Sequence, residues 1–151
     1  MERKIQIIAE SVFEKVLTAL AANEKADIEQ IRKLLMDSFD NGETIYRTAK
    51  IIEVTSKGNF KVSSESILHS AFAAAQNAVT MEAFREAGFT KKRWLTARDG
   101  KVRPQHQVLE GKTVSINEPF RVGNSLLMFP GEPSPNLEDW IECRCALLSE
   151  E

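Results

Sequence analysis

The sequence predicts an α+β protein: N-terminal helices, one of them long, followed by a small, irregular module of mostly antiparallel strands. Two observations carry this prediction. Apolar residues recur at helical spacing through most of the chain before Gly88. The stretch from Lys92 to Leu147, in contrast, holds both tryptophans, both cysteines and all five prolines. This concentration of rare residues indicates an irregular C-terminal module, in which we expect any specific function to reside.

Residues 1–60 are predicted to form a helical N-terminal region with three segments. The first covers residues 4–22. A capping box begins the second at Asp27, and Asn41-Gly42 ends it. Thr44 caps a third segment, which Lys57-Gly58-Asn59 breaks. The apolar residues that define these segments are Ile5, Ile8, Val12, Val16 and Leu20, then Ile28, Ile31, Leu34, Leu35 and Phe39, and finally Ile45, Ala49 and Ile52.

Residues 61–151 are predicted to begin with the longest helix and to form one compact unit with the N-terminal helices. This helix runs from Ser63 or Ser64 to about Ala87, and Gly88 suits the position that follows a helix. Its many alanines favour the helix and allow neighbouring helices to approach closely. His69 is expected to be a partly buried packing residue. The predicted apolar stripe consists of Leu68, Phe72, Ala75, Val79 and Ala83.

Short strands and turns are predicted after Gly88. Asp99-Gly100 and Gly123-Asn124 read as turns, and the Pro/Gly-rich residues 130–135 read as a loop. An extended segment over 140–148 would place Ile141, Cys143, Cys145 and Leu147 on one face and Arg144 on the other. The other strand candidates are Arg93–Thr96, Lys112–Ile116 and Ser125–Phe129.

The composition narrows the class of protein. A hydrophobic content of 42% is enough to build a sizeable core. The formal net charge of -2 gives no global basic field, which argues against non-specific nucleic-acid binding. No apolar run is long enough to span a bilayer, so we expect no membrane partner. A bond between Cys143 and Cys145 would close a small, strained ring, so reduced thiols in a cytoplasmic setting are expected.

Asp99, Arg103, His106 and Glu110 lie in one loop-rich segment, and Cys143 and Cys145 would join them if the last strand packs beside it. This set allows a zinc site of His106, Cys143 and Cys145, with Asp99 or Glu110 as the fourth ligand. It also allows a cysteine nucleophile activated by His106, although nothing around the cysteines marks a nucleophile.

We favour a third interpretation, in which these side chains form the internal framework of an irregular module and bind no cofactor. Trp94 and Trp140 would be core anchors, and the cysteines would face inward. Arg103 would pair with Asp99 or Glu110, and His106 would bond to backbone carbonyls.

A local group of basic residues allows a nucleic-acid patch, although such groups are more often solvated edges. Arg103 lies nearby. The candidate patch consists of Lys91, Lys92, Arg93, Arg98 and Lys101.

The order of motifs over residues 92–147 resembles phage head morphogenesis proteins of the Mu protein F-like type, and the resemblance extends over about 27–148. The motif reads Trp94, Asp99-Gly100-Lys101-Val102-Arg103, His106, Leu109-Glu110-Gly111, Pro119-Phe120, Pro130 and Cys143-Arg144-Cys145-Ala146-Leu147. Within it, the family-motif cluster comprises Trp94, Asp99, Arg103, His106, Glu110, Cys143 and Cys145.

The resemblance implies a phage or prophage minor head (capsid) protein. Such a protein would bind portal and capsid proteins, act in head assembly without catalysis, and reside in the virion or the cytoplasm of a bacterial host. A zinc-binding or toxin-associated metal-dependent enzyme module and a DNA-binding packaging accessory protein are the alternatives. One departure is clear: the long helix of the family often begins with an Arg-Thr-Glu-like triplet, and His69-Ser70-Ala71 stand here. The loss of the Arg and the Glu argues against an enzymatic site.

Overall fold

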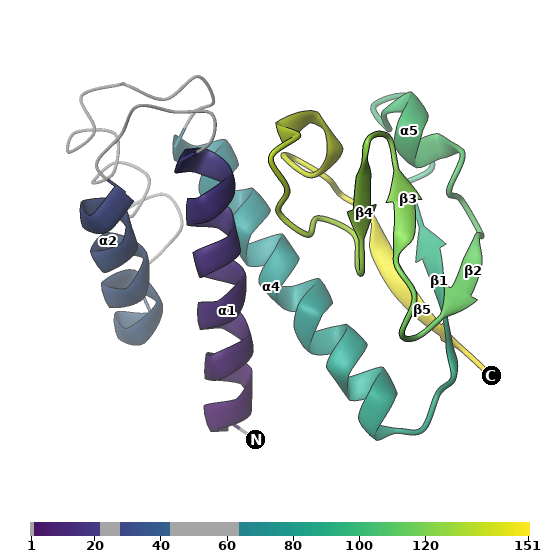
Figure 1. Ribbon diagram of the computed structural model, residues 1–151, viewed down its shortest axis with the longest axis horizontal. Coiled ribbons are helices and arrows are strands. Elements are labelled where there is room, and N and C mark those ends of the chain that lie inside the picture. The colour runs from purple at the N-terminus through teal and green to yellow at the C-terminus, as the bar shows by residue number, and fades with distance from the viewer. Residues whose placement is uncertain (1, 22–27, 43–63) are drawn as a thin grey trace.

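Helices and a group of short strands make up the computed structural model, which describes residues 2–21, 28–42 and 64–151. Helices α1 (Glu2–Ala21) and α2 (Ile28–Asn41) lie on one side, and the long helix α4 (Ser64–Glu86) lies between α1 and the strands (Figure 1). The predicted α+β class, with a long helix before a small antiparallel module, is confirmed.

The strands form two small antiparallel sheets. In the first, β1 (Lys91–Leu95) is central between β2 (Thr113–Ser115) and β5 (Ala146–Glu150). The second is a hairpin of β3 (Phe120–Val122) and β4 (Ser125–Leu127). A short helix, α5 (Pro104–Gln107), and a 3-10 turn, η1 (Leu137–Asp139), lie in the connections. The pairing of Trp94 with Leu147 joins the start of the module to its end.

Helix α4 lies at the centre of the hydrophobic core. Ala71 and Ala74 are fully buried, and small side chains at these positions let α1 and the C-terminal module approach the helix closely. On the α1 side, Phe13 meets Phe72 edge to face, with ring centroids 5.5 Å apart. Trp94 belongs to the same cluster of buried residues. One core therefore runs from α1 through α4 to the strands.

The predicted apolar stripe of α4 is correct only in part. Leu68 and Ala75 are buried, Phe72 and Val79 are half-buried, and Ala83 is exposed. The helix buries a broader face because it packs against α1 on one side and against β5 on another. His69 is exposed, so the expectation of a partly buried packing histidine is wrong.

The short elements of the C-terminal module differ most from the prediction. Strand β1 begins two residues earlier than predicted and ends before Thr96, and β4 ends before Met128. Strand β3, helix α5 and η1 were not predicted. The last strand is confined to 146–150, because residues 140–142 turn and Glu142 has a φ of 56°. The predicted alternation nevertheless holds, since Ile141, Cys143, Cys145 and Leu147 are buried and Arg144 is exposed.

In the N-terminal region, both described helices occur where the sequence predicts them. Val12 and Val16 are buried in α1, whereas Ile5 is 39% exposed. The Asp27 cap, the third segment over 44–57 and the boundary between residues 60 and 61 lie outside the described residues. None of the described helices combines the length and apolar character needed to cross a membrane.

Candidate functional site

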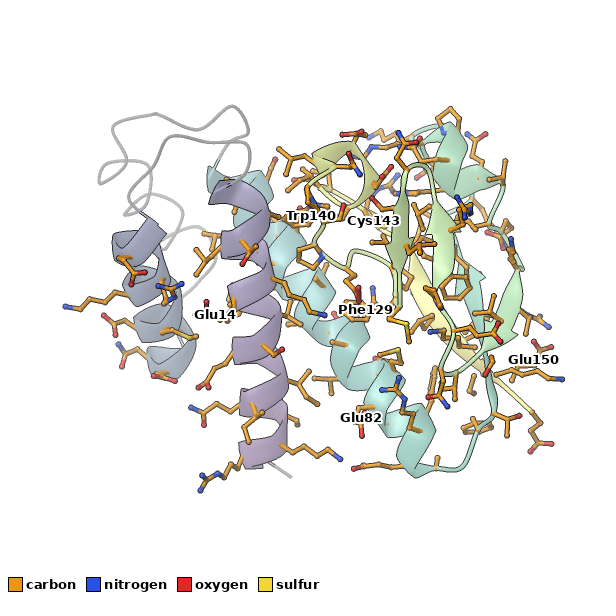
Figure 2. All side chains as sticks on the ribbon, viewed as in Figure 1. Glu14, Glu82, Phe129, Trp140, Cys143 and Glu150 are labelled. Atoms are coloured by element: carbon orange, nitrogen blue, oxygen red, sulfur yellow. The ribbon has the colours of Figure 1, made fainter. Side chains whose placement is uncertain are left out.

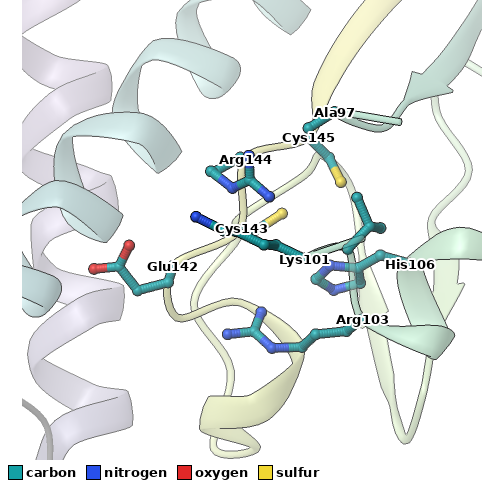
Figure 3. A pocket seen from close by; sticks show the side chains of 9 residues that line it. Ala97, Lys101, Arg103, His106, Glu142, Cys143, Arg144 and Cys145 are labelled. Atoms are coloured by element: carbon teal, nitrogen blue, oxygen red, sulfur yellow. The ribbon is translucent and has the colours of Figure 1, made fainter. Parts of the chain in front are cut away.

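A pocket of about 340 Å³ lies between α5 and the segment that leads into β5 (Figure 3). Side chains from both segments line it, so residues far apart in sequence meet there. The lining residues are Ala97, Lys101, Val102, Arg103, His106, Glu142, Cys143, Arg144 and Cys145.

His106, Cys143 and Cys145 meet at this pocket, as expected from the sequence if the last strand packed beside the earlier segment. One nitrogen of His106 and the two sulfur atoms all lie within 4.8 Å of one another. All three residues are buried, and both cysteines are free thiols. Figure 3 shows the imidazole ring and both sulfurs turned toward the same space.

The orientation of the His106 ring is set by its neighbours. Its Nε2 lies 2.9 Å from the backbone oxygen of Asp139. A carbonyl oxygen only accepts, so Nε2 carries the proton and, in the neutral ring, Nδ1 keeps a free lone pair. The fully buried Trp94 ring packs against the imidazole, with centroids 5.7 Å apart. The expected hydrogen bond from His106 to a backbone carbonyl is therefore present.

The two thiols differ in acidity. A hydrogen bond from the Cys143 side chain lowers the pKa of Cys145, and His106 and the Trp94 indole act in the same direction. The same bond, together with burial, raises the pKa of Cys143. Cys145 is therefore the more acidic thiol, and it lies beside an imidazole and a buried indole N–H.

Side chains from other segments hold the backbone around the cysteines (Figure 2 labels Cys143 between α4 and the strands). The Ser70 hydroxyl accepts a hydrogen bond from the Glu142 amide at 2.8 Å, which fixes the residue with positive φ. Arg103 donates to the carbonyl of Ile141. Asn77 Nδ2 donates to the carbonyl of Cys145 at 3.2 Å and to that of Pro130 at 2.8 Å. The long helix α4 therefore positions the cysteine segment directly.

Replacing Asn77 with alanine is expected to destabilise the protein by about 1–2 kcal/mol. Two part-buried carbonyls lose their donor, and each such loss outweighs the small gain in helix propensity. Gln76→Ala is the matched control, because Gln76 is the exposed neighbour on the same helix and should change stability by less than about 0.5 kcal/mol. Urea denaturation measures both. Equal stabilities of the two variants would contradict the anchoring role of Asn77.

Asp99 and Glu110 do not join the cluster. Both oxygens of Asp99 accept hydrogen bonds from Arg144 at 2.8 Å, and this pairing lowers the pKa of Asp99 to about 2. Glu110 accepts bonds from the backbone and hydroxyl of Thr96 and from Arg98. Neither carboxylate therefore supplies the fourth zinc ligand that the sequence suggested. The expected pairing of Arg103 with one of them is also wrong, since Arg103 bonds to Ile141.

The basic residues do not form one patch. Lys92 is fully buried on the face of β1 that carries Trp94, and its Nζ donates to the Met128 carbonyl at 2.7 Å. Arg93 pairs with Glu150, and Arg98 pairs with Glu110. Lys91, the first residue of β1, and Lys101, in the turn before α5, are exposed. The prediction of a nucleic-acid patch that includes Lys92 is therefore wrong.

A family model described as "Phage Mu protein F like protein" matches residues 29–148 of this chain. The chain belongs to the phage Mu protein F-like family. No curated protein and no solved structure matches it. Membership of this family indicates a phage head morphogenesis protein. The match extends from α2 into β5 and includes the whole pocket, whereas α1 precedes it.

Ser70, in the second turn of α4, presents a hydroxyl to the turn that precedes the cysteines. At the position of the Arg-Thr-Glu-like triplet, His69 is exposed, Ala71 is buried, and Ser70 bonds to Glu142. Sequence reasoning noted that the expected Arg and Glu are absent, but it assigned no role to the Ser70 hydroxyl. Sequence reasoning also missed Asp139, a buried residue whose carbonyl orients His106 and for which the sequence carries no local signal.

Proposed function

We propose that this protein is a minor head protein that binds portal or capsid proteins during head morphogenesis and acts without catalysis. The observation that carries the proposal is the family match over residues 29–148. A protein with this role needs a rigid body and an exposed surface for its partner. The continuous core from α1 to the strands supports the first requirement. Its place of action would be the prohead in the host cytoplasm and then the virion.

Helix α1 is our candidate for the partner surface. It precedes the family match, and Ile7, a large apolar side chain, is 56% exposed on it. A shallow hollow beside Ile7 is lined by Arg3, Gln6 and Glu10. Exposed apolar side chains within a polar rim are typical of surfaces that bind other proteins.

Co-expression with the portal, scaffold and capsid genes of the same phage tests the proposal. We expect the wild-type protein in purified proheads and at least a tenfold loss of incorporation for Ile7→Asp, because a charge placed in an apolar contact must be desolvated. Val108→Asp is the matched control, since Val108 is 79% exposed on the C-terminal module. Absence of the wild-type protein from proheads would contradict the function. Equal incorporation of the two variants would contradict only the assignment of the surface to α1.

A further inference from the structure

We propose that His106, Cys143 and Cys145 bind a zinc ion whose fourth coordination position opens into the pocket that these residues line. Their candidate ligand atoms lie within 4.8 Å of one another. Zinc bonds of about 2.0–2.3 Å place tetrahedral ligands about 3.5–3.8 Å apart. The three side chains therefore need to close by only about 1 Å, which small side-chain rotations achieve.

The surroundings of His106 favour metal binding through Nδ1. The Nε2–H group donates to the Asp139 carbonyl at 2.9 Å, which leaves Nδ1 as the nitrogen with a free lone pair. Metal-binding histidines commonly donate their other N–H to a carbonyl or a carboxylate, because this bond fixes the ring and raises its basicity. Trp94 packs against the ring and restricts its rotation.

The Trp94 indole provides an independent indication. Its Nε1 is buried and makes no hydrogen bond of normal geometry with the described residues, and it lies near the Cys145 side chain. A buried N–H without an acceptor is unfavourable. A metal-bound thiolate of Cys145 carries more negative charge than a thiol and would be a better acceptor for this N–H. The buried indole donor therefore favours a thiolate at Cys145.

The backbone that presents the two thiols is fixed before any metal binds. Ser70 holds the amide of Glu142, Arg103 holds the carbonyl of Ile141, and Asn77 holds the carbonyl of Cys145. These anchors come from α4 and from the start of α5, and so lie outside the cysteine segment itself. A site held in this way loses little conformational entropy when it binds an ion.

The ligand set selects the metal and leaves one position open. Two thiolates and one imidazole suit zinc, whereas magnesium and calcium prefer oxygen ligands. Two thiolates also neutralise the charge of the ion, so the site can remain buried. Asp99 and Glu110 are held by Arg144 and Thr96, and no further carboxylate of the described residues belongs to the group. The fourth ligand is therefore water or an anion that enters from the pocket.

Metal analysis of the reduced 151-residue protein, purified without chelators, tests this proposal. We expect about one zinc per chain, a Tm that falls on treatment with EDTA and recovers with Zn²⁺, and thiolate-to-metal charge transfer when Co²⁺ replaces zinc. Fewer than about 0.1 zinc per chain, together with no Co²⁺ charge-transfer band under reducing conditions, would overturn it. The result does not depend on the proposed role in head assembly.

Variants locate the ion. Cys143→Ser, Cys145→Ser and His106→Gln should each weaken zinc binding at least about 100-fold in competition with a chromophoric chelator, since loss of a residue that merely supports a ligand already weakens binding about 10–100-fold. Asp99→Asn is the matched control, because Asp99 bonds to the pocket residue Arg144 but does not itself line the pocket, and this variant should bind zinc as the wild type does. Full Co²⁺ spectra from folded Cys143→Ser and Cys145→Ser proteins would exclude this site. Should a variant fail to fold, the metal content and EDTA response of the wild type decide alone.

Discussion

Replacing Lys92 with methionine is expected to stabilise the protein by up to about 2 kcal/mol at pH 7, because relief of the burial penalty outweighs the loss of the donor to the Met128 carbonyl. Lys92 is fully buried in the core, where its Nζ donates to the Met128 carbonyl at 2.7 Å and lies 5.3 Å from the centroid of Phe120. Burial, followed by repulsion from Arg85, lowers the pKa of Lys92 to about 8. A charged ammonium group is therefore maintained at pH 7 in surroundings that disfavour it.

The same shift predicts how stability changes with pH. The pKa of Lys92 is about 8 in the folded protein and 10.5 for an unperturbed lysine, so the unfolded chain binds more protons between these values. The free energy of unfolding should therefore rise with pH from about 8 to 10.5, by at most about 3 kcal/mol. Below pH 8 the burial penalty is fully present, and above pH 10.5 it has disappeared.

Urea denaturation of the wild type and of Lys92→Met at several values between pH 7 and 10.5 measures this effect. The difference between the two curves removes the contributions of other groups that titrate in this range. Lys91→Met is the matched control, because Lys91 is exposed on the neighbouring position of β1 and should leave the pH dependence unchanged. If the free energies of unfolding of the wild type and of Lys92→Met change in parallel with pH, Lys92 is not the source of the pH dependence.

Lys92 also shows why part of this structure could not be predicted from the sequence. The residues Lys91-Lys92-Arg93 look like a run of exposed charge. Side chains alternate along a strand, however, and a strand that begins at Lys91 places Lys92 on the same buried face as Trp94. The predicted strand began two residues too late, at Arg93. An error of two residues at a strand boundary therefore concealed the most deeply buried charge of the described chain.

The helices were predictable because their signal is local and repeated. The periodicity of α1 and the alanine-rich sequence of α4 mark each helix several times over. Strand β3 and helix α5 have only three and four residues, which is too short for a period to appear. Their positions depend on tertiary contacts, such as the pairing of Phe120 with Leu127, that no local pattern encodes.

The candidate site, like the fold, was predictable from the sequence only in part. The residue types alone indicated His106, Cys143 and Cys145 as a candidate zinc site, because one imidazole and two thiols are typical zinc ligands. The partners of Asp99 and Glu110 could not be chosen in advance, because several arginines lie near them in the sequence. In the structure Asp99 pairs with Arg144, which is 45 residues away, and Glu110 pairs with Arg98. Long-range packing, which the sequence does not encode locally, decides between such equivalent ion pairs.

Replacing Gly123 with alanine is expected to destabilise the protein by about 2–5 kcal/mol. Gly123 occupies the first loop position of the β3–β4 hairpin with a φ of +56°, as in a type II′ turn. An L-residue is strained in this conformation by about 1–2 kcal/mol. An added Cβ would also lie 3.2 Å from Asp139 Cγ and closer still to its Oδ1.

The clash is expected to disturb neighbouring residues, because hydrogen bonds hold both the side chain and the backbone of Asp139. It is buried, its Oδ2 accepts a hydrogen bond from Ser125 at 2.7 Å, and its backbone oxygen orients His106. A shift of Asp139 must therefore break a buried hydrogen bond or move the imidazole, and each buried bond lost adds about 1–3 kcal/mol. The hairpin loop and the pocket are consequently coupled, although the loop residues do not line the pocket.

Gly88→Ala separates the two causes of this destabilisation. Gly88 also has a positive φ, of +86°, but an added Cβ would meet no atom within 4 Å. Gly88→Ala should therefore be destabilised only by backbone strain, about 1–2 kcal/mol. Gly123→Ala should be destabilised by the same strain and also by disruption of the hydrogen bonds around Asp139. Chemical denaturation of the two variants measures the difference. A loss for Gly123→Ala no larger than that for Gly88→Ala would show that Asp139 can move freely, and the contact with His106 could then not depend on the hairpin.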